Sequence, residues 1–183
     1  MDPRTYSRRE ALKDGTAVTV RSIRPADSNS LREAFKGMDQ ESVYRRFFSP
    51  KKELSPAELE QLTDVDFSSV VALVVTRQSP NGELLIGGGR YVVEVRGATG
   101  AEIAFMTSGE YRGLGIASLI LKHLRHIALD VGVQRFEAEV LADNRPMLAV
   151  FRRSGLPIRL KRDGSVVHVT LSLAGGPEQR QET

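Results

Sequence analysis

Two closely spaced glycines between a strand-like run and a long amphipathic helix constrain this chain more than any other feature. Residues 102–107 form the run, Gly113 and Gly115 follow it, and a helical pattern continues to Gly132. Because glycine leaves little side chain in the way, successive backbone N–H groups can point at one anion beside the positive end of a helix. The junction therefore predicts a site for a phosphate-bearing ligand, with Arg112 adding positive charge. The alternative is a tight turn that only permits close packing.

Other phosphate-binding motifs fit the junction less well. Residues 113–118 miss the last position of the dinucleotide pattern Gly-x-Gly-x-x-Gly/Ala. Glu139 and Asp143 come later than the acidic residue that such a fold places about 20 residues on. The chain contains no Gly-x-x-x-x-Gly-Lys-Ser/Thr, which argues against a P-loop NTPase. A dinucleotide site is therefore the weaker interpretation.

The remaining elements follow in the order strand, helices, three-strand antiparallel meander, helix, strand, helix and hairpin. Ser55, Pro56 and Glu58 form a clear helix start, with a capping box and proline at the first helical position. Three glycines at residues 87–89, inside a predicted strand, indicate a bulge or a close approach of backbone or ligand. This order predicts a mixed α/β sandwich of the α+β type. The predicted strands are residues 17–23, 70–76, 84–95, 101–107, 135–141, 157–161 and 166–173, and the predicted helices are residues 28–35, 55–62, 116–131 and 145–153.

The composition is that of one soluble domain. The 183 residues, 40% hydrophobic and 27% charged, suffice for one core, and the absence of cysteine excludes disulfides and a cysteine nucleophile. No apolar run approaches the ~20 residues of a membrane helix and no signal peptide is present, so we expect a cytoplasmic protein. The net charge of +3 is evenly spread, which argues against nucleic-acid binding. We expect a flexible arm at residues 1–13, one domain at 14–173 and a disordered tail at 174–183.

The helix after the junction has an apolar side and a polar side. His123 and His126 fall on the polar side, three residues apart. Two such histidines can bind a metal, but no third ligand is spaced to complete a site. We therefore predict two exposed histidines and no metal. The apolar side comprises Ile116, Ile120, Leu124, Ile127 and Val131.

The junction and a later segment together resemble the GNAT superfamily of N-acetyltransferases. The acyl-CoA loop of this superfamily has the pattern Arg/Gln-x-x-Gly-x-Gly/Ala, which Arg112, Gly115 and Ala117 match. A later superfamily segment has an asparagine that opens a helix ending at Gly-Phe. Here Asn144 matches the asparagine, and residues 155–156 are Gly-Leu. The resemblance implies a GNAT-like fold, with a mixed, mostly antiparallel central sheet flanked by helices.

Residues 14–173 resemble in particular the catalytic domain of bacterial protein-lysine acetyltransferases of the Pat type. In that family a glutamate on the strand before the loop is the general base, and the matching position is Glu102. A lysine amine, with a pKa of about 10.4, must lose a proton before it attacks a thioester. Glu139 and then Glu110 are reserve candidates, and a solvent-facing strand residue is the alternative for Glu102. The matching segments are residues 14–16, 21–27, 45–50, 53–56 and 139–147.

The resemblance further implies acetyl-CoA as co-substrate. Its diphosphate is expected on the N–H groups of residues 112–117, and its pantetheine arm along residues 105–107. A backbone N–H of Phe105 or Met106 would polarise the thioester carbonyl. The residues implied to bind the co-substrate are Phe105, Met106, Thr107, Arg112, Gly113, Leu114, Gly115, Ile116, Ala117, Asn144 and Phe151.

Phe151 departs from the superfamily, because many members place a tyrosine there as general acid. A thiol with a pKa of about 8.5 leaves readily as a thiolate, so the expected loss is small. The sequence thus predicts an N-acetyltransferase that acetylates a primary amine, a protein lysine in the favoured interpretation. A small-molecule amine acetyltransferase and a non-catalytic acyl-CoA-binding regulatory module are the alternatives. Whether the protein is a monomer or a homodimer stays open.

Residues 45–48, Arg-Arg-Phe-Phe, have two interpretations. They could line the groove for the acceptor amine. The alternative is a helix in which Phe47 and Phe48 pack inward while Arg45 and Arg46 stay in solvent, and we favour this alternative for the two phenylalanines.

Overall fold

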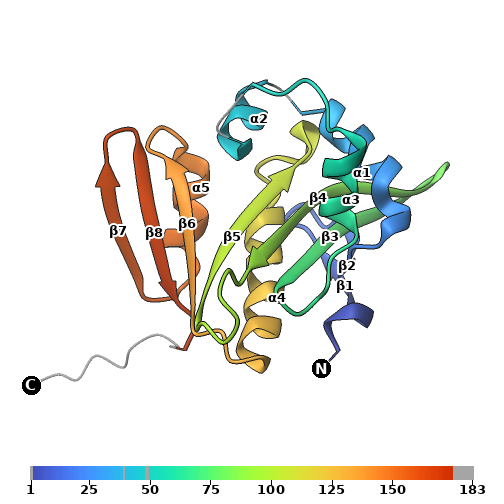
Figure 1. Ribbon diagram of the computed structural model, residues 1–183. Coiled ribbons are helices and arrows are strands. Elements are labelled where there is room, and N and C mark those ends of the chain that lie inside the picture. Colours follow the sequence, from blue (N-terminus) through green and yellow to red (C-terminus); the bar gives the residue numbers. More distant parts are fainter. Residues whose placement is uncertain (1, 39, 48–49, 175–183) are drawn as a thin grey trace, which may run out of the picture.

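The computed structural model describes residues 2–38, 40–47 and 50–174, which form one eight-stranded sheet with helices on both faces (Figure 1). The strand order is β1-β2-β3-β4-β5-β6-β8-β7. Neighbouring strands are antiparallel except β5 and β6, which are parallel. The predicted mixed, mostly antiparallel fold is confirmed. The strands are β1 (Ser7–Ala11), β2 (Ala17–Ser22), β3 (Val70–Ser79), β4 (Gly82–Val92), β5 (Gly100–Thr107), β6 (Arg135–Leu141), β7 (Ile158–Asp163) and β8 (Val166–Ser172).

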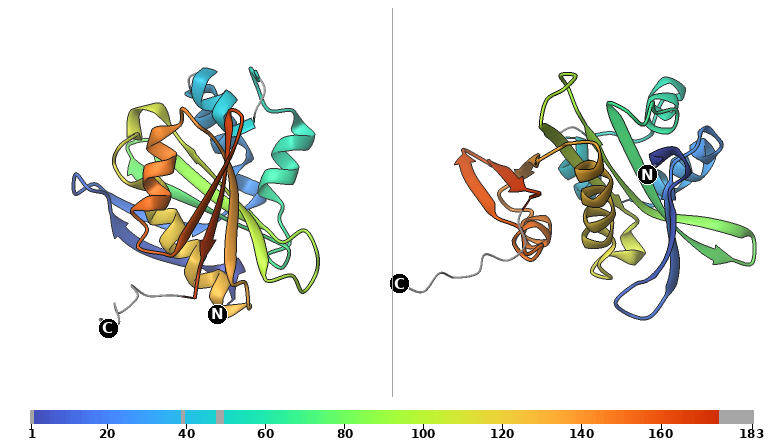
Figure 2. Two further views of the ribbon diagram at one scale, coloured as in Figure 1. Left: turned by 90° about the vertical axis from the view of Figure 1, so that its left-hand side faces the viewer. Right: turned by 90° about the horizontal axis from the view of Figure 1, so that it is seen from below.

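Helices α4 and α5 pack on one face of the sheet, and α1 and α3 on the other (Figure 2). Helix α2 contacts β5 and lies above its C-terminal end in Figure 1. Among the described residues, no helix is long and apolar enough to cross a membrane. The helices are α1 (Ser28–Lys36), α2 (Gln40–Phe47), α3 (Pro56–Thr63), α4 (Ile116–Asp130) and α5 (Arg145–Arg152), with single 3-10 turns at Pro3–Thr5, Pro25–Asp27 and Gly109–Tyr111.

Glycines in β4 allow α4 to approach the sheet closely. A Cβ atom at Gly89 would lie 2.7 Å from Cγ2 of Ile120, and one at Gly87 would lie 2.7 Å from Cγ2 of Ile116. Any side chain at these positions would push the helix away. For residues 87–89 we predicted a bulge or a close approach of backbone or ligand; the structure has a register shift opposite residues 85–87, between Val75 and Thr76 of β3, and a close approach of side chains from α4. Of the apolar side predicted for α4, Val131 is exposed, because the helix ends at Asp130.

The N-terminal residues form an edge strand, so the predicted flexible arm is wrong for this part of the chain. Strand β1 pairs with β2 from Ser7 to Ala11, and the flanking side chains of Tyr6 and Leu12 are buried. The side chains of β1 itself are mostly exposed and charged, so the strand shows no apolar alternation in the sequence. Of the predicted tail, residues 175–183 lie outside the described part of the chain.

Strand β1 also changes the environment of one histidine. His123 is buried, not exposed as predicted, because β1 covers that side of α4. Its Nδ1 lies 2.5 Å from the hydroxyl of Tyr6, and its Nε2 lies 3.0 Å from Oε1 of Glu10. Burial lowers the pKa of His123, and the nearby Glu10 carboxylate opposes this shift. His126 is exposed, as predicted.

A buried arginine joins β2 to β4 near the start of β4. Arg21 donates two 2.8 Å hydrogen bonds to the carboxylate of Asp27, and bonds of 2.8 and 3.1 Å to that of Glu83. The bonds from Arg21 are the main cause that lowers the pKa of Glu83 to about 2. This charge cluster stabilises the half of the sheet that lies away from β6.

Candidate active site

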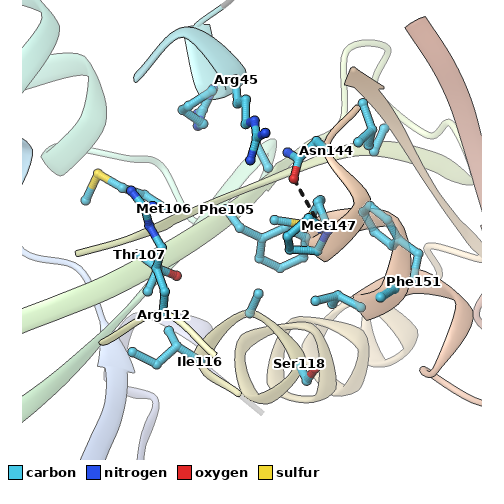
Figure 3. Close-up of a pocket in the computed structure, with 18 of the residues that line it drawn as sticks. Arg45, Phe105, Met106, Thr107, Arg112, Ile116, Ser118, Asn144, Met147 and Phe151 are labelled. Atoms are coloured by element: carbon cyan, nitrogen blue, oxygen red, sulfur yellow. Dashed lines mark hydrogen bonds between the residues drawn. The ribbon is translucent and has the colours of Figure 1, made fainter. Parts of the chain in front are cut away.

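The candidate site is a cleft that opens where β5 and β6 separate. Three residue pairs join these parallel strands, from Gly100 with Arg135 to Glu102 with Glu137. Beyond Glu102, β5 continues to Thr107 paired with β4 but not with β6. The edge of residues 103–107 that faces away from β4 therefore borders the cleft. The cleft has a volume of about 620 Å³, within the range of ligand-binding pockets (Figure 3).

Apolar side chains from three elements form the inner wall of the cleft. Phe105 comes from β5, Ile116 from α4 and Phe151 from α5, and all three are buried. The rings of Phe105 and Phe151 lie 5.9 Å apart between centroids. The structure thus brings together residues that are 46 positions apart in the sequence and that were both predicted to bind the co-substrate. Phe151 contributes apolar surface and has no proton to donate.

The glycine junction lies at one end of the cleft and is open to it. Gly113 and Gly115 have φ angles of +76° and +91°, a backbone region that favours glycine, and α4 begins directly after them. Arg112, Gly113, Gly115 and Ala117 line the cleft, together with Thr107 (Figure 3). The N-terminus of α4 and its preceding loop therefore face a cavity, which suits an anionic group of a ligand.

Leu114 is predicted to contact the co-substrate through its backbone N–H, and Lys13 is not among the predicted site residues. Leu114 does not line the cleft, because its side chain packs against the core while its carbonyl accepts a 3.2 Å hydrogen bond from the N–H of Lys13. Lys13 lines the cleft from the turn between β1 and β2. The pair Asp14 and Gly15, a common hairpin turn, is the sequence signal that could have identified this turn.

Asn144 lies on the opposite wall, at the start of α5. Its side-chain oxygen accepts a 3.3 Å hydrogen bond from the N–H of Met147 and caps the helix, as predicted for Asp143 or Asn144 (Figure 3). Both Asn144 and Met147 line the cleft. The cap thus fixes the direction of α5 relative to the cleft.

Glu102 lies at the point where the two strands separate. Its side chain is exposed and lines the cleft, on the face of the sheet opposite the buried Ile103. Of the reserve candidates, Glu139 also lines the cleft, with Oε1 3.3 Å from Nδ1 of His168, whereas Glu110 is exposed and does not line it.

Positive side chains accompany Glu102. Arg45 and Arg46 of α2 are half-buried and line the cleft, so of the two interpretations left open for these arginines, the one that keeps them in solvent does not hold. Burial lowers the pKa of Arg46 to about 10; Arg90 acts in the same direction and Glu102 against it. Phe47 packs inward as predicted, 5.7 Å from the ring of Phe35, and Phe48 lies outside the described residues. The arginines face the cleft because α2 lies over the end of β5.

Comparison with known sequences gives consistent matches. The profile of the acetyltransferase (GNAT) family matches residues 38–156. The chain is 35% identical over 144 residues to acetyltransferase Pat of Mycolicibacterium smegmatis, covering 79% of this chain and 42% of Pat. It is 31% identical over 139 residues to acetyltransferase PA5475 of Pseudomonas aeruginosa, and the match covers 75% of this chain and 74% of PA5475. The chain thus spans less than half the length of Pat.

Solved structures agree with the sequence matches. The GNAT domain of S. lividans PAT superposes with a TM-score of 0.82 at 30% identity, covering 91% of this chain and 96% of that domain. A cAMP-binding acyltransferase from Mycobacterium smegmatis superposes with a TM-score of 0.65 at 30% identity, covering 97% of this chain and 50% of that protein. The predicted resemblance is confirmed, and the chain belongs to the acetyltransferase (GNAT) family.

Proposed function

We propose that this chain transfers an acetyl group from acetyl-CoA to a primary amine, a lysine of a protein, with Glu102 as the general base. The observation that carries this proposal is the position of Glu102. It is a carboxylate at the fork of two separating strands, and it lines the same cleft as the glycine loop. A ligand anchored by phosphates at the loop and extended along β5 would bring its far end toward this carboxylate.

The cleft fits a polyanionic ligand. Gly113 and Gly115 add no side chains of their own to the loop before α4, and the open edge of residues 103–107 offers backbone groups for an extended arm. Cationic side chains outnumber carboxylates along the cleft, which suits the phosphates of CoA. The cations are Lys13, Arg45, Arg46, Arg112 and Arg153, and the carboxylates are Glu102 and Glu139.

Each residue then has a defined task in direct transfer. When bound, acetyl-CoA supplies the activated thioester. Glu102 accepts a proton from the acceptor ammonium, a step that is typically worth about 10²–10⁴ in rate. A backbone N–H of Phe105 or Met106 stabilises the charge that develops on the carbonyl oxygen. The sequence has no cysteine that could carry the acetyl group, and the thiol can leave as a thiolate without a proton from Phe151.

The test compares the wild type with Glu102→Gln, using acetyl-CoA and a lysine-containing peptide. We expect turnover to fall by about 10²–10⁴, while the affinity for CoA, measured by calorimetry, stays unchanged. Glu137→Gln is the matched control, because Glu137 is the register partner of Glu102 on β6 but does not line this cleft.

Equal turnover for the wild type and Glu102→Gln would show that Glu102 is not the base. A loss in Glu139→Gln alone would assign that role to Glu139, which lines the same cleft.

Two other functions remain alternatives. Arg45 and Arg46 lie in the cleft with Glu102 and favour a small acceptor amine that also carries a carboxylate. A screen of amines with acetyl-CoA, read as free thiol released, separates this acceptor from a protein lysine. A non-catalytic acyl-CoA-binding module predicts binding of CoA without thiol release on any amine.

A further inference from the structure

The turn between β1 and β2 has a well-defined backbone. The N–H of Leu12 donates to the carbonyl of Thr16 at 2.9 Å, and the N–H of Gly15 donates to that of Leu12 at 2.9 Å. Oδ1 of Asp14 accepts a further 2.9 Å bond from the N–H of Thr16. Gly15 takes a φ of +85°, and Leu12 is buried. This turn therefore holds Lys13 in a defined place.

Lys13 lies against the glycine loop. Its backbone N–H donates to the carbonyl of Leu114, and its side chain crosses Gly115. A Cβ atom at Gly115 would lie 3.1 Å from Cε, 3.3 Å from Cγ and 3.5 Å from Cδ of Lys13. The whole aliphatic stem thus covers the glycine, and Lys13 lines the cleft beside Arg112 and Gly113.

The hairpin is attached to α4 at a second place. Nζ of Lys122 donates a 3.1 Å bond to Oε1 of Glu10, and the Tyr6 hydroxyl contacts the buried His123. Strand β1 is therefore tied to the middle of α4 as well as to the loop at its N-terminus. These two attachments fix Lys13 relative to the end of the helix that faces the cleft.

The ammonium group of Lys13 remains available to a ligand. Its side chain is exposed, and among residues 2–38, 40–47 and 50–174 it makes no ion pair or hydrogen bond. A lysine ammonium is a compact charge that binds phosphate oxygens. It stands at the same end of the cleft as the loop amides, so the two kinds of donor can share one anion or bind neighbouring ones.

We propose that Lys13 binds a phosphate group of CoA, so that the β1–β2 hairpin is part of the co-substrate site. This inference rests on the proposed acetyl-CoA site. The phosphate is either the diphosphate or the 3′-phosphate of CoA, which present the same chemistry to an ammonium group. The role of Lys13 is binding, so its loss affects affinity and leaves the chemical step unchanged.

The test measures CoA binding by titration calorimetry for the wild type, Lys13→Met, Lys13→Arg and Arg9→Met. Loss of a charge-assisted phosphate contact is expected to raise the Kd of Lys13→Met about tenfold. Lys13→Arg keeps the charge and is expected to stay within about threefold of the wild type. Arg9→Met removes the same charge from an exposed position of the same hairpin and is expected to bind like the wild type.

Dephospho-CoA, which lacks the 3′-phosphate, locates the contact. If Lys13→Met and the wild type bind it equally, Lys13 contacts the 3′-phosphate; if the tenfold difference persists, Lys13 contacts the diphosphate. Wild-type affinity for CoA in Lys13→Met, or an equal loss in Arg9→Met, would overturn the inference. A wild type that does not bind CoA at all would overturn the proposed function as well.

Discussion

The two edges of strand β5 differ in what lies beside them. On one edge, residues 102–107 pair with residues 87–92 of β4; we call this the closed seam. On the other edge, pairing with β6 stops at Glu102, and the cleft takes its place; we call this the open seam. Helix α4 covers the closed seam and packs close to it because the glycines of β4 have no side chains in the way. One strand thus has one edge that is paired with β4 and another edge that borders the cleft over residues 103–107.

The comparison also explains the position of Glu102. Successive strand residues face opposite sides of the sheet, so Ile103 and Phe105 enter the core under α4 while Glu102 and Met106 face the side of α1 to α3. A charged side chain at residue 102 avoids burial because the open seam begins there.

Enlarging a small residue should have opposite consequences at the two seams, and this is the largest effect we expect. Gly89→Val in the closed seam forces a side chain against Ile120 and should lower the free energy of unfolding by about 3 kcal/mol. Ala117→Phe, in the first turn of α4 beside the open seam, projects into the cleft. It should change the free energy of unfolding by less than about 0.5 kcal/mol.

Denaturant unfolding and calorimetry with CoA check both variants. We expect Ala117→Phe to raise the Kd for CoA more than tenfold, since about 1.4 kcal/mol of lost contact suffices. Under conditions in which Gly89→Val remains folded, this variant should still bind CoA. The distinction between the seams fails if Gly89→Val is as stable as the wild type, or if Ala117→Phe binds CoA normally.

Most of the elements around the open seam could be predicted from the sequence, because each of them depends on residues close together in the chain. The strand, the glycine loop and the start of α4 are consecutive, and β6 was predicted with the bounds that the structure shows, Arg135–Leu141. The capping residue Ser55 and its partner Glu58 likewise act within one helical turn. Periodicity and capping signals describe such segments well.

What the sequence did not reveal depends on contacts between distant segments. Strand β1 has little apolar pattern. It is stabilised by pairing with β2 and by packing on α4, where Tyr6 contacts His123, a residue 117 positions later in the sequence. Because that strand was not predicted, His123 was expected to be exposed, and Lys13 was not recognised as a residue of the cleft. The orientation of the arginines of α2 likewise depends on a contact between distant segments. They face the cleft because α2 lies over β5.

Low pH should lower the free energy of unfolding through Glu83 of β4, and this effect should be smaller than those of Gly89→Val and Ala117→Phe. The pKa of Glu83 is about 2 in the folded protein, below its ordinary value of 4.5, mainly because of the bonds from Arg21. Its contribution is therefore fully present above pH 4.5 and is lost as the pH falls toward 2. Glu83→Gln should cost about 1 kcal/mol at pH 7, since the carboxylate is partly exposed.

Thermal unfolding between pH 2 and pH 7 checks this expectation. The difference in melting temperature between the wild type and Glu83→Gln should be greatest at neutral pH and should become small as the pH falls to about 2. CoA binding at pH 7 should stay unchanged, because Glu83 does not line the cleft. A pH-independent difference would mean that the carboxylate charge contributes nothing.

Hydrogen–deuterium exchange, measured with and without CoA, tests most directly whether the open edge of β5 holds the co-substrate. We expect CoA to slow exchange in peptides covering residues 103–107 and 112–117, because a bound ligand would protect the amides of the open seam and of the glycine loop. Peptides covering the exposed edge strand β7 should exchange at the same rate with and without CoA. CoA that binds without changing exchange at residues 103–107 would contradict the account.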